Sequence, residues 1–108
     1  MRLAMVFMIV PVIAVAQDWQ PLTGAAISSA LASREVVYVD GTHQSFAADG
    51  ATFYGDTTGH WRVEADQYCS QWPPSDRWSC YGVELSGVDL RFIAADGTFS
   101  VGRYVDLQ

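Results

Sequence analysis

Residues 59–81, GHWRVEADQYCSQWPPSDRWSCY, decide the fold of this chain. They contain both cysteines, three of the four tryptophans and the only Pro-Pro pair. Trp61 and Val63 alternate with charged residues, which is typical of a half-buried strand. The segment therefore predicts a strand, a second strand that ends in a rigid polar loop, and a third strand. We expect Cys69 and Cys80 to clamp the base of that loop.

Residues 1–16 have the pattern of a secretory signal peptide. Arg2 gives a positive start, residues 3–15 are almost wholly apolar, and residues 14–16 (Ala-Val-Ala) suit a signal peptidase. The apolar run is too short to span a bilayer, which needs about 20 residues. We predict a periplasmic or secreted protein with no membrane span after cleavage. Residues 17–108 are then a single domain.

Export also bears on the two cysteines. Exported compartments are oxidising, so Cys69 and Cys80 are expected to form a disulfide. Their spacing lacks the Cys-x-x-Cys arrangement that tunes a redox-active thiol. We therefore predict a structural bridge, and a disulfide-clamped domain.

The net charge of the chain limits the classes of partner that it can bind. Twelve acidic residues stand against six basic ones, a net charge of −6. Removing Arg2 with the signal peptide leaves five basic residues against twelve acidic ones, a net charge of −7. Nucleic acids and anionic membranes require a basic surface, so the sequence argues against both. A basic protein or a cationic ligand fits the charge, and so does a charge that serves solubility alone.

After the predicted signal peptide, the pattern first favours one short helix. Thr23 suits the N-cap position, and the apolar stripe consists of Leu22, Ala26, Ile27, Ala30 and Leu31. So short a helix is not stable alone, so we expect it to pack on a sheet.

Beyond Ser33 the pattern is that of short strands separated by turns. Asp-Gly pairs at positions 40, 49 and 96 favour tight hairpins. Strands are expected at residues 35–40, 43–47, 52–54, 61–65, 68–72, 78–85, 90–94 and 98–105, with 55–59 as a polar loop. We predict a mainly β fold, an antiparallel meander curled into a strongly bent sheet or small barrel. The N-terminal helix would cover an open end or face.

Candidate catalytic and metal-binding residues are few. His43 and His60 are the only histidines, and each has an aspartate shortly before it, Asp40 and Asp56, with which a His–Asp pair is conceivable. A zinc site needs three or four converging ligands. The chain contains no Gly-x-Ser-x-Gly elbow and no calcium-loop pattern. We predict a non-catalytic protein with no metal or other cofactor.

The loop between Trp72 and Trp78 is the strongest candidate for a binding site. It contains two prolines and Arg77, and the expected disulfide holds its base. A preorganised loop loses little entropy on binding, so Trp72, Arg77 and Trp78 are predicted ligand-binding residues. The alternative is that the aromatic residues pack the core and that Arg77 stacks on a tryptophan for structure.

Several short motifs resemble a family. They are Leu-Thr-Gly-Ala-Ala-Ile at 22–27, Gly-His-Trp at 59–61, Cys69 before a polar loop, and Cys-Tyr at 80–81, with Asp-Gly hairpins. Together they are similar to small exported proteobacterial proteins grouped as a domain of unknown function. The resemblance covers nearly the whole mature chain and implies export, a disulfide and a β-rich fold. It implies no activity and no catalytic residue.

Two classes of function fit these features. One is an envelope binding module that holds a small apolar or glycan ligand, at the loop between Trp72 and Trp78 or inside the curled sheet. The other is an acidic inhibitor-type protein that docks on a basic enzyme. The two differ in salt dependence, because docking driven by charge weakens as ionic strength rises.

Overall fold

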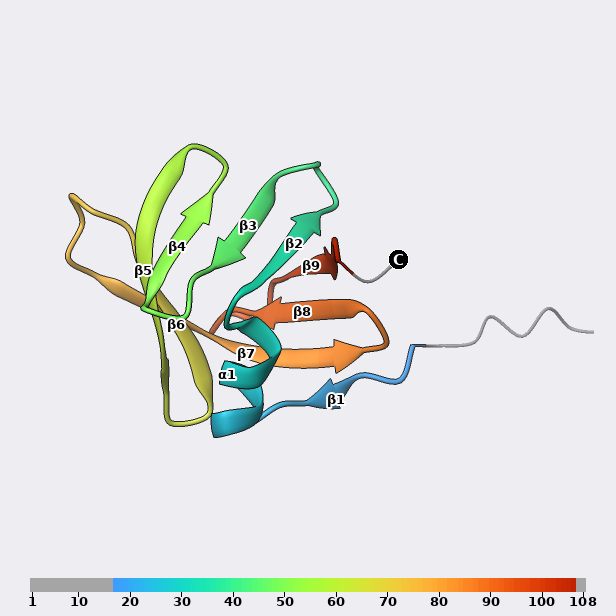
Figure 1. The fold of residues 1–108 in the computed structure, drawn as a ribbon. Helices are drawn as coiled ribbons and strands as arrows, with labels where there is room; N and C mark the ends of the chain where they lie inside the picture. Colours follow the sequence, from blue (N-terminus) through green and yellow to red (C-terminus); the bar gives the residue numbers. More distant parts are fainter. Residues whose placement is uncertain (1–16, 107–108) are drawn as a thin grey trace, which may run out of the picture.

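The computed structural model describes residues 17–106, and the predicted signal peptide at 1–16 lies outside them. These residues are mainly strand, with one short helix (Figure 1). The elements are β1 (Gln20–Pro21), α1 (Gly24–Leu31), β2 (Arg34–Tyr38), β3 (His43–Phe46), β4 (Ala51–Tyr54), β5 (Thr57–Glu64), β6 (Gln67–Gln71), β7 (Trp78–Ser86), β8 (Asp89–Ile93) and β9 (Phe99–Tyr104).

The sheet closes into an eight-stranded antiparallel barrel, with β1 as an extra strand outside it. Strands β2 to β9 each pair with the next along the chain, and β9 returns to pair with β2. The long strand β7 makes closure possible, because residues 78–81 pair with β6 and residues 82–86 pair with β8. The predicted meander is confirmed, and it forms a barrel.

The three Asp-Gly hairpins share one turn geometry. The carboxylates of Asp40, Asp49 and Asp96 each accept the backbone N–H two residues further on, at 2.9, 3.1 and 3.0 Å. The glycine after each aspartate has a φ of 89°, 100° and 89°, a region that favours glycine. The turn predictions at these positions are confirmed.

The expected polar loop at 55–59 is wrong. The turn consists of Gly55 and Asp56 alone, and β5 already begins at Thr57. Thr57 and Thr58 are β-branched, which suits a strand. Position 59 of β5 requires a glycine, because the ring of Trp72 occupies the space that a Cβ would need.

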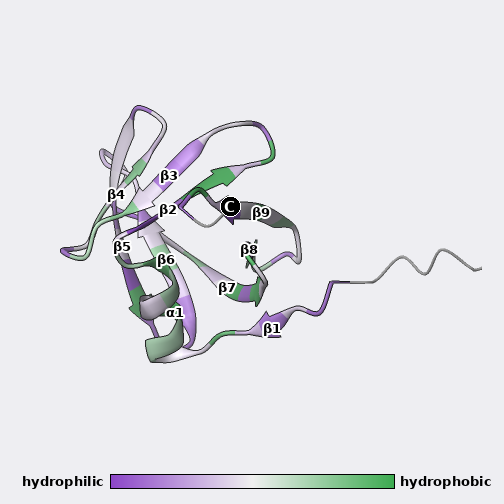
Figure 2. Ribbon diagram, turned by 45° about the vertical axis from the view of Figure 1, so that its right-hand side comes forward, coloured by the Kyte–Doolittle hydropathy of each residue, from purple (hydrophilic) through white to green (hydrophobic). Residues whose placement is uncertain are grey.

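The helix plugs one end of the barrel. Its Ile27 and Leu31 are fully buried in the same core as the strand residues, and α1 contacts β2, β5 and β6. The Tyr104 hydroxyl donates to the carbonyl of Ala30 at 2.6 Å. Thr23 occupies the predicted N-cap position without a side-chain cap bond, and Ala26 of the predicted stripe is exposed. Figure 2 shows much of α1 in hydrophobic colours.

The barrel interior beneath α1 is filled by aromatic and aliphatic side chains. Phe46 is fully buried at its centre and lies edge-on to Trp61 and Tyr68, with ring centroids 5.8 and 5.6 Å away. The other buried strand residues of this core are Val36, Val83, Leu90, Phe92 and Tyr104. Within residues 17–106, no helix has the length and hydropathy to cross a membrane.

Candidate ligand-binding site

The barrel end opposite α1 opens into a cavity of about 650 Å³. In an antiparallel meander successive turns alternate between the two ends. The turns after β2, β4, β6 and β8 therefore share the open end, and residues from all of these regions line the cavity. We call this open end the mouth.

Half of the residues that line the cavity are aromatic. Tyr38 and Tyr54, from β2 and β4, have ring centroids 5.8 Å apart, and Tyr54 lies edge-on to Trp72 at 6.2 Å. Deeper in the barrel, Tyr68 of β6 stacks with Tyr81 of β7 at 5.9 Å. Each ring is held by another ring, so the wall is preformed.

Gln44 of β3 forms the polar floor of the cavity. Its Oε1 accepts a hydrogen bond from the Tyr38 hydroxyl at 2.6 Å. Its Nε2 donates to Thr52 Oγ1 at 2.9 Å and to the Tyr68 hydroxyl at 3.1 Å. Gln44 is only 4% exposed, and these bonds satisfy its buried amide and fix the two tyrosines.

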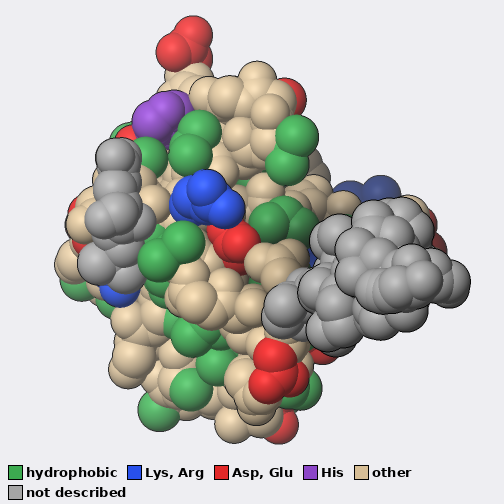
Figure 3. All heavy atoms as spheres, turned by 90° about the vertical axis from the view of Figure 1, so that its right-hand side faces the viewer, with side chains coloured by type: hydrophobic (Ala, Val, Ile, Leu, Met, Phe, Trp, Pro, Cys, Tyr) green, Lys and Arg blue, Asp and Glu red, His purple; other side chains and the backbone are tan. Residues whose placement is uncertain are grey.

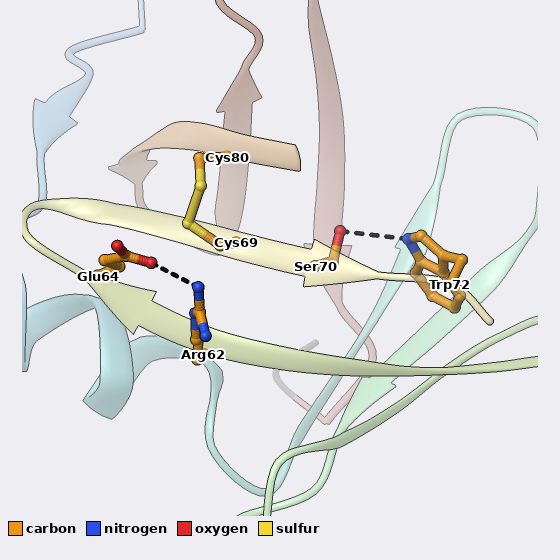
Figure 4. Close-up of a disulfide and its surroundings, with 6 residues drawn as sticks. All are labelled: Arg62, Glu64, Cys69, Ser70, Trp72 and Cys80. Atoms are coloured by element: carbon orange, nitrogen blue, oxygen red, sulfur yellow. Dashed lines mark hydrogen bonds and ion pairs between the residues drawn. A yellow bond between two sulfur atoms is a disulfide. The ribbon is translucent and has the colours of Figure 1, made fainter. Parts of the chain in front are cut away.

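Besides the Tyr54 ring, two further contacts hold Trp72 in the mouth. Its indole Nε1 donates to Ser70 Oγ at 3.2 Å (Figure 4). Its ring also lies against the backbone of Gly59, where an added Cβ would stand 2.5 Å from Trp72 Cε3. The cis peptide between Pro73 and Pro74 follows directly. Gly59 is thus a site residue that sequence reasoning did not assign; a glycine inside a strand pattern is the signal of such a close approach.

The disulfide between Cys69 and Cys80 is confirmed. It joins directly paired residues of β6 and β7, one residue before Ser70 on β6 (Figure 4). Because Ser70 lines the cavity and strand residues alternate between faces, the bridge lies on the outer face of the barrel. It therefore clamps β6 and β7, the two strands that the loop at residues 72–77 connects, as predicted.

The structure separates the three predicted binding residues. Trp72 lines the cavity, whereas Trp78 and Arg77 do not. Trp78 is covered by a stacked arginine, but this is Arg62, whose guanidinium carbon lies 4.0 Å from the ring centroid. Arg77 is exposed in the loop, where its backbone N–H donates to Ser75 Oγ at 3.2 Å.

The histidines lie on the barrel exterior. His43 Nδ1 is 2.6 Å from Glu35 Oε2 in an exposed pair, so the partner of His43 is Glu35 and not Asp40. His60 is exposed and does not line the cavity. Within residues 17–106 no three His, Cys, Asp or Glu side chains are grouped so that they could hold a metal ion.

Four of the five arginines of residues 17–106 form ion pairs, and none of the five lines the cavity. Basic and acidic side chains lie side by side on the face seen in Figure 3. The arginine ion pairs are Arg34–Asp106, Arg62–Glu64, Arg91–Glu84 and Arg103–Asp89. The cavity lining contains one charged residue, Asp40.

Burial makes the stability of the barrel sensitive to alkaline pH. Desolvation raises the pKa of Tyr38 well above the ordinary value of 10.0, and it also raises the pKa values of Tyr68 and Tyr104. Their contribution to stability is complete below pH 10.0 and is lost progressively as the pH rises from there toward the folded pKa values, because the unfolded chain releases these protons first. We expect the melting temperature to fall between about pH 10 and pH 12. Thermal melts with absorbance near 295 nm test this; ionisation of all five tyrosines near pH 10 without loss of stability would contradict it.

Comparisons with protein-family models, curated protein sequences and solved structures found no match to this chain, so the resemblance to an exported family stays a prediction.

Proposed function

We propose that this protein is a non-catalytic binding module of the cell envelope that holds a small, largely apolar organic molecule in the barrel mouth. The observation that carries the proposal is the cavity of about 650 Å³. Ligand sites are typically concave, of about 300–1,000 Å³, and lined by aromatic side chains with a few placed polar groups. The disulfide fits an exported protein, because such bonds persist in oxidising compartments.

The site is preorganised, which favours binding. Gln44 fixes the hydroxyls of Tyr38 and Tyr68, and Ser70 with Gly59 fixes Trp72. Little side-chain entropy is left to lose when a ligand enters, so more of the contact energy appears as affinity. The buried hydroxyl of Ser70 supplies a polar group for orientation.

Binding can be tested with N-phenyl-1-naphthylamine, a neutral fluorophore whose emission rises in apolar surroundings. We expect its emission to increase with the mature protein and the tryptophan emission to be quenched as Trp72 is contacted. High salt should leave this binding unchanged, because no charge is involved. No response to the probe, together with a partner from envelope extract that is lost at high salt, would favour the acidic inhibitor-type protein instead.

Gly59→Ala tests whether the position of Trp72 in the mouth is needed for binding. The new Cβ would stand 2.5 Å from Trp72 Cε3 and 2.6 Å from the carbonyl oxygen of Gln71, so both the Trp72 ring and the backbone at Gln71 must shift. We expect a stability cost of about 1–3 kcal/mol and at least about tenfold weaker probe binding. Affinity is measured by fluorescence titration, and folding by thermal melts.

Gly82→Ala is the matched control for this variant. Gly82 lies on β7, and a Cβ there meets nothing closer than Ile93 Cβ at 4.0 Å. Its probe binding should equal that of the unaltered protein. If the folded Gly59→Ala variant binds the probe as tightly as the unaltered protein, Trp72 is not part of the binding site.

A further inference from the structure

The charge of the cavity restricts its ligand. Asp40 is the one charged residue of the lining, which contains no arginine and no histidine. A carboxylate, sulfate or phosphate group on the ligand would therefore lose its hydration without gaining a counter-charge. The backbone N–H of Thr42 lowers the pKa of Asp40 below its ordinary value, so its carboxylate is ionised at neutral pH.

The turns around the mouth add negative charge. Turns that follow β2, β4, β6 and β8 each contain one aspartate, Asp40, Asp56, Asp76 and Asp96. Arg77 is the one basic residue among them, so four carboxylates stand against one guanidinium. A mouth of one sign concentrates ligands of the opposite sign and speeds their arrival.

Three rings that line the cavity, those of Tyr38, Tyr54 and Trp72, carry no arginine of the described residues on their faces, whereas Phe99, which also lines it, is covered by Arg91. In the part of the chain that the structure describes, arginines lie over the rings of Trp19, Trp78, Phe99 and Tyr104. No arginine lies over Tyr38, Tyr54 or Trp72 in residues 17–106. Aromatic rings attract a desolvated cation electrostatically, and substituted ammonium groups are bound in aromatic cages.

We infer that the ligand of this cavity is a small organic cation, a substituted ammonium with an apolar body, bound between Asp40 and the rings of Tyr38, Tyr54 and Trp72. The apolar body fills the cavity toward Tyr68 and Tyr81, and the ammonium stays at the mouth. This inference rests on the proposed function and names the class of ligand.

Three probes of one shape and different charge test the inference. They are the phenyltrimethylammonium cation, its neutral isostere tert-butylbenzene, and the benzenesulfonate anion. Each competes with N-phenyl-1-naphthylamine for the mature protein. The cation is expected to bind at least about fivefold more tightly than the neutral isostere, and the anion more weakly than both.

Asp40→Asn removes the charge and keeps the turn, because the asparagine Oδ1 can still accept the Thr42 N–H. It should weaken binding of the cation by about three- to tenfold and change that of the neutral isostere by less than about twofold. Asp49→Asn is the matched control: the same turn, with its hydrogen bond from Ala51, lies at the opposite end of the barrel. It should leave both affinities unchanged.

The outcomes separate the two proposals. Equal affinity for cation and isostere, with no effect of Asp40→Asn, overturns the cation preference and leaves the binding cavity standing. An equal loss in Asp40→Asn and Asp49→Asn overturns it too, because the effect would then come from overall charge. Failure of N-phenyl-1-naphthylamine itself to bind overturns the proposed function and the inference with it.

Discussion

Phe46→Ala is expected to lower the free energy of unfolding by about 3–5 kcal/mol, the largest effect of any single substitution considered. The side chain is fully buried, and its ring contacts the rings of Trp61, Tyr68 and Phe92 at 5.8, 5.6 and 6.3 Å. Alanine would leave a cavity among rings that the barrel walls hold in place, so little collapse can offset the loss. Urea denaturation followed by fluorescence measures the change.

Phe53→Ala is the control on the neighbouring strand. Phe53 lies on β4 with 44% of its surface exposed, and it pairs with Ser45 of β3, one residue before Phe46. The same atoms are removed, but nearly half of the surface of Phe53 already faces water, whereas that of Phe46 is fully buried. We expect a cost below about 1 kcal/mol. Equal losses at Phe46 and Phe53 would show that the interior ring cluster is not the main source of stability.

Replacement of both Cys69 and Cys80 by alanine is expected to lower stability by about 3 kcal/mol. The cysteines are separated by 11 residues, and the loop they close gains freedom in the unfolded chain when the bridge is absent. For a domain of this size the melting temperature should fall by roughly 10–25 °C. Calorimetry of both proteins under oxidising conditions provides the measurement.

Reduction of the unaltered protein is the control for the double replacement. Melting in the presence of a reductant should bring it close to the double variant, which reductant should leave unchanged. A double variant that melts with the unaltered protein under oxidising conditions would mean that strand pairing alone holds β6 and β7 together.

Much of the fold could be predicted because its signals are local. Asp40, Asp49 and Asp96 each precede a glycine, and each lies in a hairpin turn whose hydrogen bonds span only a few residues. The prediction of a polar loop at residues 55–59 was wrong because the deciding contact is not local. Gly59 is a loop signal by composition, and only its contact with Trp72 of another segment explains why a strand needs glycine there.

The candidate site was predictable only in part. Trp72 was identified because the prolines beside it mark a rigid loop. Gln44, Tyr38 and Tyr54 were not, although their alternation places them on one face of their strands. Alternation tells which side chains enter the barrel, but not which end of the interior is filled and which is hollow. That difference arises because α1 covers one end only.

Strand β1 and the end of β9 both lie at the barrel end that α1 covers. β1 pairs with residues 84 and 85 near the end of β7, and the backbone N–H of Tyr104 donates to the carbonyl of Val88 in the turn that follows. Both chain ends of the described residues thus leave from the plugged side, away from the mouth (Figure 1). A tether, tag or sensor surface attached at either end would hold the barrel with its cavity facing solution.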